Sequence, residues 1–228
     1  MKYTYLLINF LIVLFPFALS FDKRVAFYKS WKFIWPGMAI TGLVFLFWDV
    51  LFTVQGVWSF NPGRIIGITF FELPLEEILF FLTVPFACVF IYACLNYYVK
   101  WELNNRLTRI ISNLILILSL LILLFHYDKL YTVVTFSLLF IVIAYLQFKL
   151  KVQWLSRFYM AYAGSLIPFY IINGILTGIP VVLYNDAENL GIRIGTIPFE
   201  DHFYSMVLLV MNIGFFEYFK NKSTAAHG

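Results

Sequence analysis

The sequence predicts an all-α integral membrane protein with seven transmembrane helices in a 3+1+3 duplicated parallel bundle. Composition, apolar segments and a repeated acidic motif lead to this prediction. Of the 228 residues, 62% are hydrophobic and only 12% are charged, and the mean hydropathy is +0.87. A soluble domain cannot bury so large a share of apolar side chains. The chain therefore belongs in a membrane.

Seven apolar segments are candidate membrane helices. A helix rises about 1.5 Å per residue, and the hydrocarbon core is about 30 Å thick. The segments comprise residues 3–21, 32–53, 74–98, 109–125, 130–148, 156–178 and 198–219, of which the fourth is the shortest. Lys2 and the sequence Ala18-Leu19-Ser20 also give the first segment some features of a cleavable signal peptide. The fifth segment occupies in the second half of the chain the place that the first segment has in the first half. This correspondence favours a permanent helix over a cleaved signal peptide.

Basic residues are sorted by loop. Of the 16 Lys and Arg residues, only Lys2, Arg64, Lys129 and Arg193 fall on one side of the predicted bundle. The positive-inside rule then places the N-terminus outside and the C-terminus in the cytoplasm. The basic surplus is spread over four cytoplasmic stretches that face lipid, without a compact cluster that would track a nucleic acid. We expect a multi-pass protein of the cell membrane, in bacteria the inner membrane, with lipid and not nucleic acid as partner.

Two acidic motifs open the third and the seventh segment. Residues 73–77 read Leu-Pro-Leu-Glu-Glu, and residues 197–201, which lie 124 positions later, read Ile-Pro-Phe-Glu-Asp. At the same offset Asp49-x-x-x-Thr53 matches Asn173-x-x-x-Thr177. Two motifs that share one offset indicate an internal duplication.

The duplication predicts how the chain is organised. The first three-helix repeat comprises residues 1–105, a linking helix residues 106–128, and the second repeat residues 129–228. Four crossings separate each helix from its copy, so the repeats run in the same direction around a pseudo-twofold axis along the membrane normal. The polar connectors 61–65 and 189–194 align only if a small gap is allowed. The apolar stretch 65–71 suggests that the first connector dips into the membrane.

The acids of the two motifs are candidate catalytic groups. Proline at the start of a helix and an acid in its first turn are ordinary features of helix N-termini, which accounts for one acid per helix. A second acid in each helix, and Asp49 at the same level, need another explanation, because an ionisable residue in a membrane segment costs roughly 2.5–3.5 kcal/mol. The candidates are Glu76, Glu77, Glu200, Asp201 and Asp49.

Aromatic side chains next to the acids are candidate substrate-binding groups. Phe80 lies one helical turn from Glu76, and Tyr204 lies one turn from Glu200. Neighbouring candidates are Phe81, Phe203 and Trp48, of which the last precedes Asp49. Trp58 is assigned instead to the aromatic belt at the membrane interface.

Three further polar residues complete the predicted site. Asn173 occupies the position of Asp49 in the second repeat. Arg64 and Arg193 belong to the connectors that lead into the acidic motifs. Two roles stay open for these arginines: they pair with the acids and set their protonation, or they anchor the loops at lipid headgroups.

Several cofactor chemistries lack a signature in the sequence. There is no glycine-rich dinucleotide motif, no Ser-His-Asp triad that places well and no histidine-rich metal site. Cys88 and Cys94 are six residues apart, a spacing that suits neither a redox pair nor a metal site. The sequence therefore predicts a site without a cofactor or a metal.

The motifs resemble those of the small integral-membrane lycopene cyclases. The resemblance rests on Phe47-Trp48-Asp49, Asn61-Pro62-Gly63-Arg64, residues 74–81, residues 173–178 and Pro198-Phe199-Glu200-Asp201. In this family the two halves are separate chains in some members and fused in others, as here. The resemblance implies a redox-neutral cycloisomerisation, of the intramolecular lyase or isomerase type, that closes the ends of lycopene into β-ionone rings without a flavin. It also implies lycopene or a related acyclic carotenoid as substrate, with other carotenoid-pathway enzymes as further partners.

The residues suit the chemistry that the resemblance implies. Ring closure begins with protonation of an isolated alkene, which an ionised carboxylate cannot perform. A carboxyl that is buried beside a second carboxylate is favoured in its neutral form. Aromatic faces and an absence of water suit the resulting cation. Our hypothesis is that Glu76 or Glu77 in one half and Glu200 in the other are the acid and the base, with Asp49, Asn173, Arg64 and Arg193 setting their protonation.

Two other functions compete with this hypothesis. A small membrane carrier for a solute or for protons would also have parallel three-helix repeats around a polar axis, and its acids would bind the transported species. A structural subunit of a carotenoid-processing complex would convert nothing by itself. Conversion of lycopene to a cyclic product distinguishes the enzyme from both alternatives.

Overall fold

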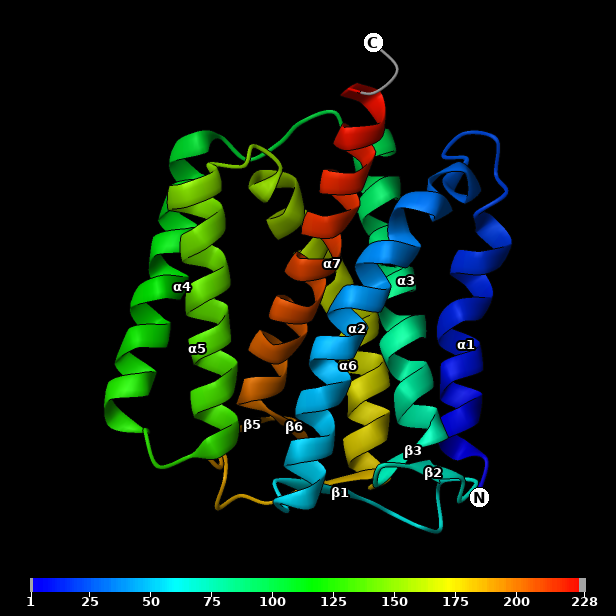
Figure 1. Cartoon of the computed structure of the whole chain (residues 1–228), viewed down its shortest axis with the longest axis vertical. Helices are drawn as coiled ribbons and strands as arrows, with labels where there is room; N and C mark the ends of the chain where they lie inside the picture. Colours follow the sequence, from blue (N-terminus) through cyan, green and yellow to red (C-terminus); the bar gives the residue numbers. More distant parts are fainter. Residues whose placement is uncertain (1, 226–228) are drawn as a thin grey trace.

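The computed structural model describes residues 2–225, a range that contains seven α-helices (Figure 1). The last residues of the predicted second repeat, 226–228, lie outside the described residues. The helices are α1 (Thr4–Leu19), α2 (Trp31–Val54), α3 (Leu75–Tyr98), α4 (Asn105–Phe125), α5 (Leu130–Ala144), α6 (Leu155–Gly178) and α7 (Phe199–Ala225). The predicted helical class is confirmed in its main part, since the described chain is mostly helical with a few short strands.

Five helical segments are long and apolar enough to cross a membrane. They are Phe27–Val54, Leu75–Tyr98, Asn105–Phe125, Leu130–Leu150 and Leu155–Gly178. Helix α1 is apolar but has only 16 residues, and the 27 residues of α7 carry acids at one end and Lys222 at the other. The start of α1 and the end of α7 lie at opposite ends of the long axis of the bundle (Figure 1). Seven crossings and the orientation in the membrane stay predictions.

Three helix boundaries differ by four residues or more from those predicted, and one of them is the end of α7, which lies at Ala225 and not at residue 219. Helix α4 begins four residues earlier because Asn104 caps it, and its side chain accepts a hydrogen bond of 2.8 Å from the Leu107 N–H. The regular part of α5 ends at Ala144, and a π-helical turn, η2 (Tyr145–Leu150), follows it. A short 3₁₀ turn, η1 (Phe27–Ser30), precedes α2.

Short strands in the two connectors join the repeats. The strands are β1 (Trp58–Phe60), β2 (Thr69–Phe70), β3 (Leu73–Pro74), β4 (Val182–Tyr184), β5 (Arg193–Ile194) and β6 (Ile197–Pro198). Strands β2 and β3 form one hairpin and β5 and β6 form another. Strand β1 pairs with β4 so that Ser59 lies opposite Leu183. Each of these two residues is the other's counterpart at the offset of 124, so the pseudo-twofold axis passes between them.

The connectors align without a gap, which corrects the sequence-based alignment. Each strand of the first repeat maps onto its counterpart in the second at the single offset of 124: β1 onto β4, β2 onto β5 and β3 onto β6. Asn61 therefore corresponds to Asn185 and not to Asn189. The Asn61 N–H donates to the Val181 carbonyl at 2.9 Å, and the Asn185 N–H donates to the Val57 carbonyl at 2.9 Å. Each connector is thus tied to the backbone of the other repeat.

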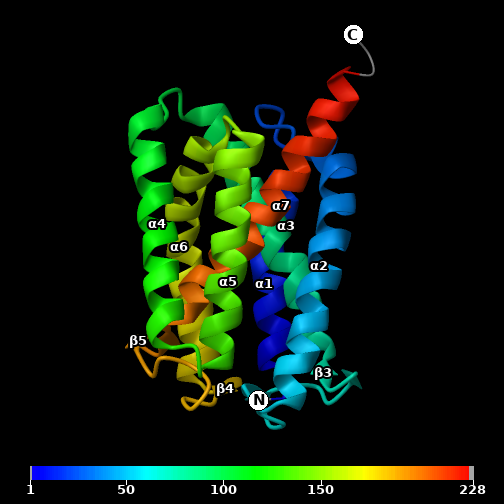
Figure 2. The same ribbon diagram turned by 60° about the vertical axis from the view of Figure 1, so that its left-hand side comes forward.

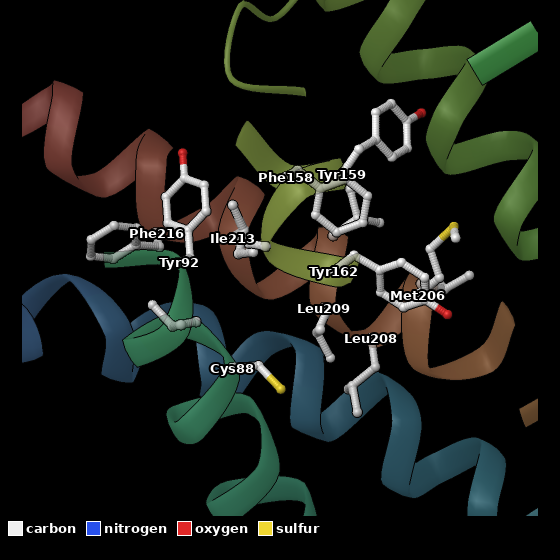
Figure 3. Close-up of a cluster of buried hydrophobic side chains, with 14 of the residues drawn as sticks. Cys88, Tyr92, Phe158, Tyr159, Tyr162, Met206, Leu208, Leu209, Ile213 and Phe216 are labelled. Carbon is white, nitrogen blue, oxygen red and sulfur yellow. The ribbon is translucent and has the colours of Figure 1, made fainter. Parts of the chain in front are cut away.

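The helices of the two repeats interlock. Helix α2 packs against α7 of the other repeat, and α6 packs against α3. The first helix of each repeat packs on the third, α1 on α3 and α5 on α7, while the linking helix α4 lies along α5 (Figure 2). The buried core between α3, α6 and α7 contains Cys88, Tyr92, Phe158, Met206 and Ile213 (Figure 3). Neither repeat therefore buries its apolar surface without the other.

Close packing of α2 on α7 depends on Gly37, which makes a stability prediction. A Cβ atom at this position would lie 2.7 Å from the Cβ of Phe215. Overpacking of this kind costs typically about 1–3 kcal/mol. We expect Gly37→Ala to lower the thermal unfolding midpoint in detergent by several degrees.

The matched control is Gly42→Ala in the same helix. No atom lies within 4 Å of a Cβ added to Gly42, so this variant should unfold at the wild-type temperature or slightly above it. Equal midpoints for the two variants would contradict the close contact of α2 with α7.

Candidate active site

The first acid of each motif holds the connector that precedes it. An oxygen of Glu76 accepts a hydrogen bond of 2.7 Å from the Ile66 N–H, and an oxygen of Glu200 accepts one of 2.7 Å from the Leu190 N–H. Both side chains are fully buried. Thr132 adds a second hydrogen bond, of 2.6 Å, to the same oxygen of Glu200. These two acids satisfy backbone donors that would otherwise lack a partner inside the protein.

The second acid of each motif is held by a tyrosine from the first helix of its own repeat. The hydroxyl of Tyr5 in α1 donates to Glu77, and that of Tyr131 in α5 donates to Asp201 at 2.7 Å. Asp201 receives another hydrogen bond of 2.8 Å from Tyr184 in β4. The side chains of these tyrosines fix the orientation of both carboxyl groups.

Asp49 differs from the other acids because it has no partner. Its side chain is 1% exposed, and neither oxygen makes a hydrogen bond within the described part of the chain. Its counterpart, Asn173, donates a 3.3 Å hydrogen bond to the Phe169 carbonyl within α6. Thr53 and Thr177 both bond back to these positions, since each hydroxyl donates to the carbonyl four residues earlier. The two halves share backbone geometry here but not the acid.

One buried cavity of about 80 Å³ collects the second acids and Asp49. It lies where α2, α3, α6 and α7 meet, next to the paired strands β1 and β4. Predicted site residues that line it are Asp49, Glu77, Phe80, Phe81, Asn173, Asp201 and Tyr204. Further aromatic rings in its wall are those of Tyr5, Trp58, Phe60, Tyr131, Phe169 and Tyr184. The cavity therefore presents carboxyl groups among aromatic faces.

The remaining predicted residues lie elsewhere. Trp48 lines a separate groove with Phe45, and the ring of Phe203 packs on Phe136 with centroids 5.0 Å apart. Trp58, which the sequence assigned to an interfacial belt, lines the cavity instead of Trp48. A tryptophan beside an acid in sequence points to a different side of the helix, because successive residues are rotated by about 100°.

The two arginines do not pair with the motif acids. Arg193 forms an ion pair of 2.6 Å with Asp186, and no ion pair of Arg64 occurs among residues 2–225. At the offset of 124, Arg64 corresponds to Glu188 and not to Arg193. The backbone carbonyls of Arg64 and Glu188 do share a role, since they accept hydrogen bonds from the N–H groups of Tyr5 and Tyr131.

Sequence reasoning missed the three tyrosines that hold the second acids. Tyr5 and Tyr131 are counterparts at an offset of 126, not 124, because the first helix and the loop after it are together two residues longer in the first repeat. A search for repeated residues that allowed for this loop would have found them. Burial, together with the nearby carboxyl of Asp201, raises the pKa of Tyr184 well above its usual range, so its hydroxyl stays a donor at neutral pH.

These features define a duplicated helical membrane protein with a cluster of buried carboxyl groups where its repeats meet. The lycopene cyclase family matches the chain in two segments, residues 2–95 and 128–219. The chain belongs to the lycopene cyclase family. The two segments contain all the acids described above and leave out α4. No curated protein and no solved structure matches the chain.

Removing the acceptor at Glu76 should release the first connector. The Ile66 N–H then loses its partner, which costs about 1–3 kcal/mol for a buried donor. We expect Glu76→Ala to increase amide hydrogen exchange of the segment around Ile66, measured by mass spectrometry, whereas Glu76→Gln, which keeps an oxygen acceptor, should retain most of the protection.

The second repeat offers a parallel test, since Glu200→Ala should expose the Leu190 amide in the same way. For the first repeat the control is Glu72→Gln, at an exposed acid that lies four residues before Glu76. Unchanged exchange at Ile66 in Glu76→Ala would mean that Glu76 does not hold the connector.

Proposed function

We propose that this chain is a lycopene β-cyclase, an intramolecular lyase or isomerase that closes acyclic carotenoid ends into β-ionone rings. One observation carries the proposal: the unpartnered carboxyl of Asp49 shares a buried, aromatic cavity with Glu77 and Asp201. Membership of the lycopene cyclase family supports a carotenoid as substrate. The choice of the β ring follows the resemblance of the motifs.

The reaction is a proton-initiated isomerisation. A carboxyl group gives its proton to the terminal alkene of the substrate, which leaves a tertiary cation on the carbon that bears two methyl groups. The neighbouring double bond attacks this cation, forms the carbon–carbon bond that closes the six-membered ring, and moves the positive charge into the ring. Loss of a ring proton to a carboxylate forms the new double bond. The product is an isomer of the substrate, so the balance requires no oxidant or reductant.

We assign proton donation to Asp49. A negative charge on its buried carboxyl would accept no hydrogen bond in the present geometry, with only the unpartnered Trp58 indole N–H and Tyr204 hydroxyl in the same cavity as candidate donors. The protonated carboxyl has to transfer its proton directly to the alkene. Asp49 lines the cavity that would hold this end of the substrate. Its counterpart Asn173 cannot donate in this way, since an amide is not an acid at neutral pH.

Proton acceptance falls to Glu77 or Asp201. Their oxygens accept hydrogen bonds from tyrosine hydroxyls, an arrangement that stabilises a carboxylate. Both line the same cavity as Asp49, so they face the cation as it forms. The assignment replaces Glu200 by Asp201 and keeps Glu77 from the sequence-based hypothesis. Glu76 and Glu200 become positioning residues, because one oxygen of each binds the connector and neither side chain lines the cavity.

Aromatic rings next to the acids suit a cationic intermediate. Trp58, Tyr131 and Tyr204 form a cluster with ring centroids between 5.2 and 6.2 Å apart. Ring faces attract a cation electrostatically and do not trap it as a nucleophile would, and the effect grows where water is excluded. Phe80 and Phe81 face the same cavity from α3.

The proposal includes the setting of the reaction. We propose a multi-pass protein of the cell membrane, the inner membrane in bacteria, with two fused repeats of residues 1–105 and 129–228 and a linking helix of residues 106–128. Its substrate dissolves in lipid, and other enzymes of carotenoid synthesis would supply and consume its reactants. The proposed reaction uses side chains of this chain alone.

Substitution of the cavity acids tests the proposal in cells that accumulate lycopene. General acid catalysis contributes typically about 10²–10⁴-fold, so Asp49→Asn should reduce cyclic product by at least about a hundredfold. The double variant Glu77→Gln/Asp201→Asn should lose a comparable amount of product. Of the two single variants, the one at the acid that accepts the proton should show the larger loss. Cyclic and acyclic carotenoids are separated by chromatography and normalised to membrane protein.

Glu200→Gln distinguishes the two assignments. If Glu200 is the base, this variant is inactive; if it only positions the connector, the amide oxygen preserves most activity. Glu72→Gln at the exposed acid controls for expression. Full activity in Asp49→Asn would refute proton donation by Asp49.

Solvent isotope uptake tests the mechanism independently. Protonation by a carboxyl that exchanges with solvent predicts one deuterium atom per ring when purified protein in lipid vesicles converts lycopene in D₂O. Mass spectrometry of the cyclic product measures this uptake. A carrier would form no cyclic product under these conditions, and a ring that forms without deuterium would exclude a proton from an exchangeable acid.

A further inference from the structure

Two apolar grooves flank the acid cavity on opposite sides of the pseudo-twofold axis. The first, between α1, α3 and α6, is called here the α1–α6 groove, and its wall includes Ile8, Ile12, Phe80, Ile91, Phe169 and Ile172. The second, between α2, α5 and α7, is the α2–α5 groove, and its wall includes Phe45, Trp48, Val134, Leu138 and Tyr204.

The grooves are counterparts of each other. Phe169 and Ile172 correspond at the offset of 124 to Phe45 and Trp48, and Phe80 corresponds to Tyr204. Ile8 and Ile12 in α1 correspond at the offset of 126 to Val134 and Leu138 in α5. The duplication therefore gives two grooves at equivalent positions. Differences between them indicate which groove binds the substrate.

The α1–α6 groove is the larger of the two. Its volume is about 340 Å³, against about 220 Å³ for the α2–α5 groove. Along α3 it extends from Phe80 to Ile91, which is roughly 16 Å at 1.5 Å per residue. On the opposite side α7 lines the groove only from Tyr204 to Val207, roughly 5 Å by the same measure, although both grooves run for eight residues along the first helix of their repeat, Ile8 to Pro16 in α1 and Val133 to Ile141 in α5.

The α1–α6 groove borders the acid cavity more extensively than the α2–α5 groove does. Phe80, Val84, Phe169, Asn173 and Ser205 line both spaces. The α2–α5 groove shares a single residue, Tyr204, with the cavity. An elongated molecule can therefore pass from the α1–α6 groove into the cavity with its end beside the acids, whereas the ring of Tyr204 separates the other groove from them.

The outer wall of the α1–α6 groove faces lipid. Leu11 and Phe15 in α1 and Ile171 in α6 line the groove and are 49%, 67% and 60% exposed. In a membrane these exposed apolar side chains meet acyl chains, so a hydrophobic substrate reaches the groove without crossing water.

We propose that the α1–α6 groove binds the polyene chain of the substrate while one end group lies in the acid cavity, and that the α2–α5 groove does not bind it. The inference rests on the proposed function for the identity of the polyene. The inference assigns one orientation to the bound substrate. The substrate enters from the lipid between α1 and α6, and its reacting end points toward Asp49.

A matched pair of substitutions tests the inference. Ile12→Trp fills the α1–α6 groove, and Leu138→Trp places the same side chain at the counterpart position in the α2–α5 groove. Ile172→Trp, which introduces the residue that Trp48 already supplies on the other side, is the second variant of the α1–α6 groove. Gel filtration and thermal unfolding in detergent verify that each variant folds.

Binding and turnover are measured separately with lycopene. Binding is followed by the circular dichroism induced in the visible band of lycopene, which is achiral in solution and acquires a signal when a chiral site holds it. Turnover is followed by chromatography of the cyclic product. We expect Ile12→Trp and Ile172→Trp to weaken binding and product formation at least tenfold and Leu138→Trp to change both by less than twofold.

The outcomes separate the groove from the chemistry. Wild-type binding in both α1–α6 variants, or an equal loss in Leu138→Trp, would overturn the assignment of the groove and leave the proposed function standing. If the chain binds lycopene with the expected pattern and forms no cyclic product, the groove assignment stands and the proposed function fails. A wild-type chain that binds no lycopene would overturn both.

Discussion

The backbone pairing between the two connectors is the constraint on which the rest of the structure depends. Non-helical backbone next to a membrane must find partners within the protein. Strands β1 and β4 supply them to each other across the pseudo-twofold axis, and Asn61 and Asn185 bond to the connector of the other repeat. Glu76 and Glu200 satisfy two more backbone donors. This pairing fixes where α3 and α7 begin, and thereby brings the second acids into one cavity.

The two acids of each motif divide their work for a geometric reason. Consecutive residues of a helix point about 100° apart, so both acids of a pair cannot face the same space. In each repeat the first acid turns to the connector and the second turns to the axis, where a tyrosine holds it. In each pair the first acid therefore holds the connector and the second lines the cavity. The same arrangement in both halves makes an accidental contact an inadequate explanation.

The two repeats depart from their symmetry at three places around the cavity and the grooves. Asp49 faces Asn173 across the duplication, and Asp201 receives two tyrosine hydrogen bonds where Glu77 receives one. Trp48 stands where the other groove has Ile172. A symmetric site would offer equivalent acids and two equivalent grooves. These differences favour one donor and one path from the lipid.

The sequence by itself determined the membrane class, the helices, the duplication at an offset of 124 and the set of acids, because composition, apolar length and repeated spacing are properties of the chain in order. Only the tertiary structure decided which acid of each pair faces the cavity, and that Trp58 and not Trp48 lines it. It also revealed Tyr5 and Tyr131, whose offset of 126 concealed their equivalence. Such facts depend on how helices rotate and pack against distant segments, and a linear pattern carries no record of that rotation.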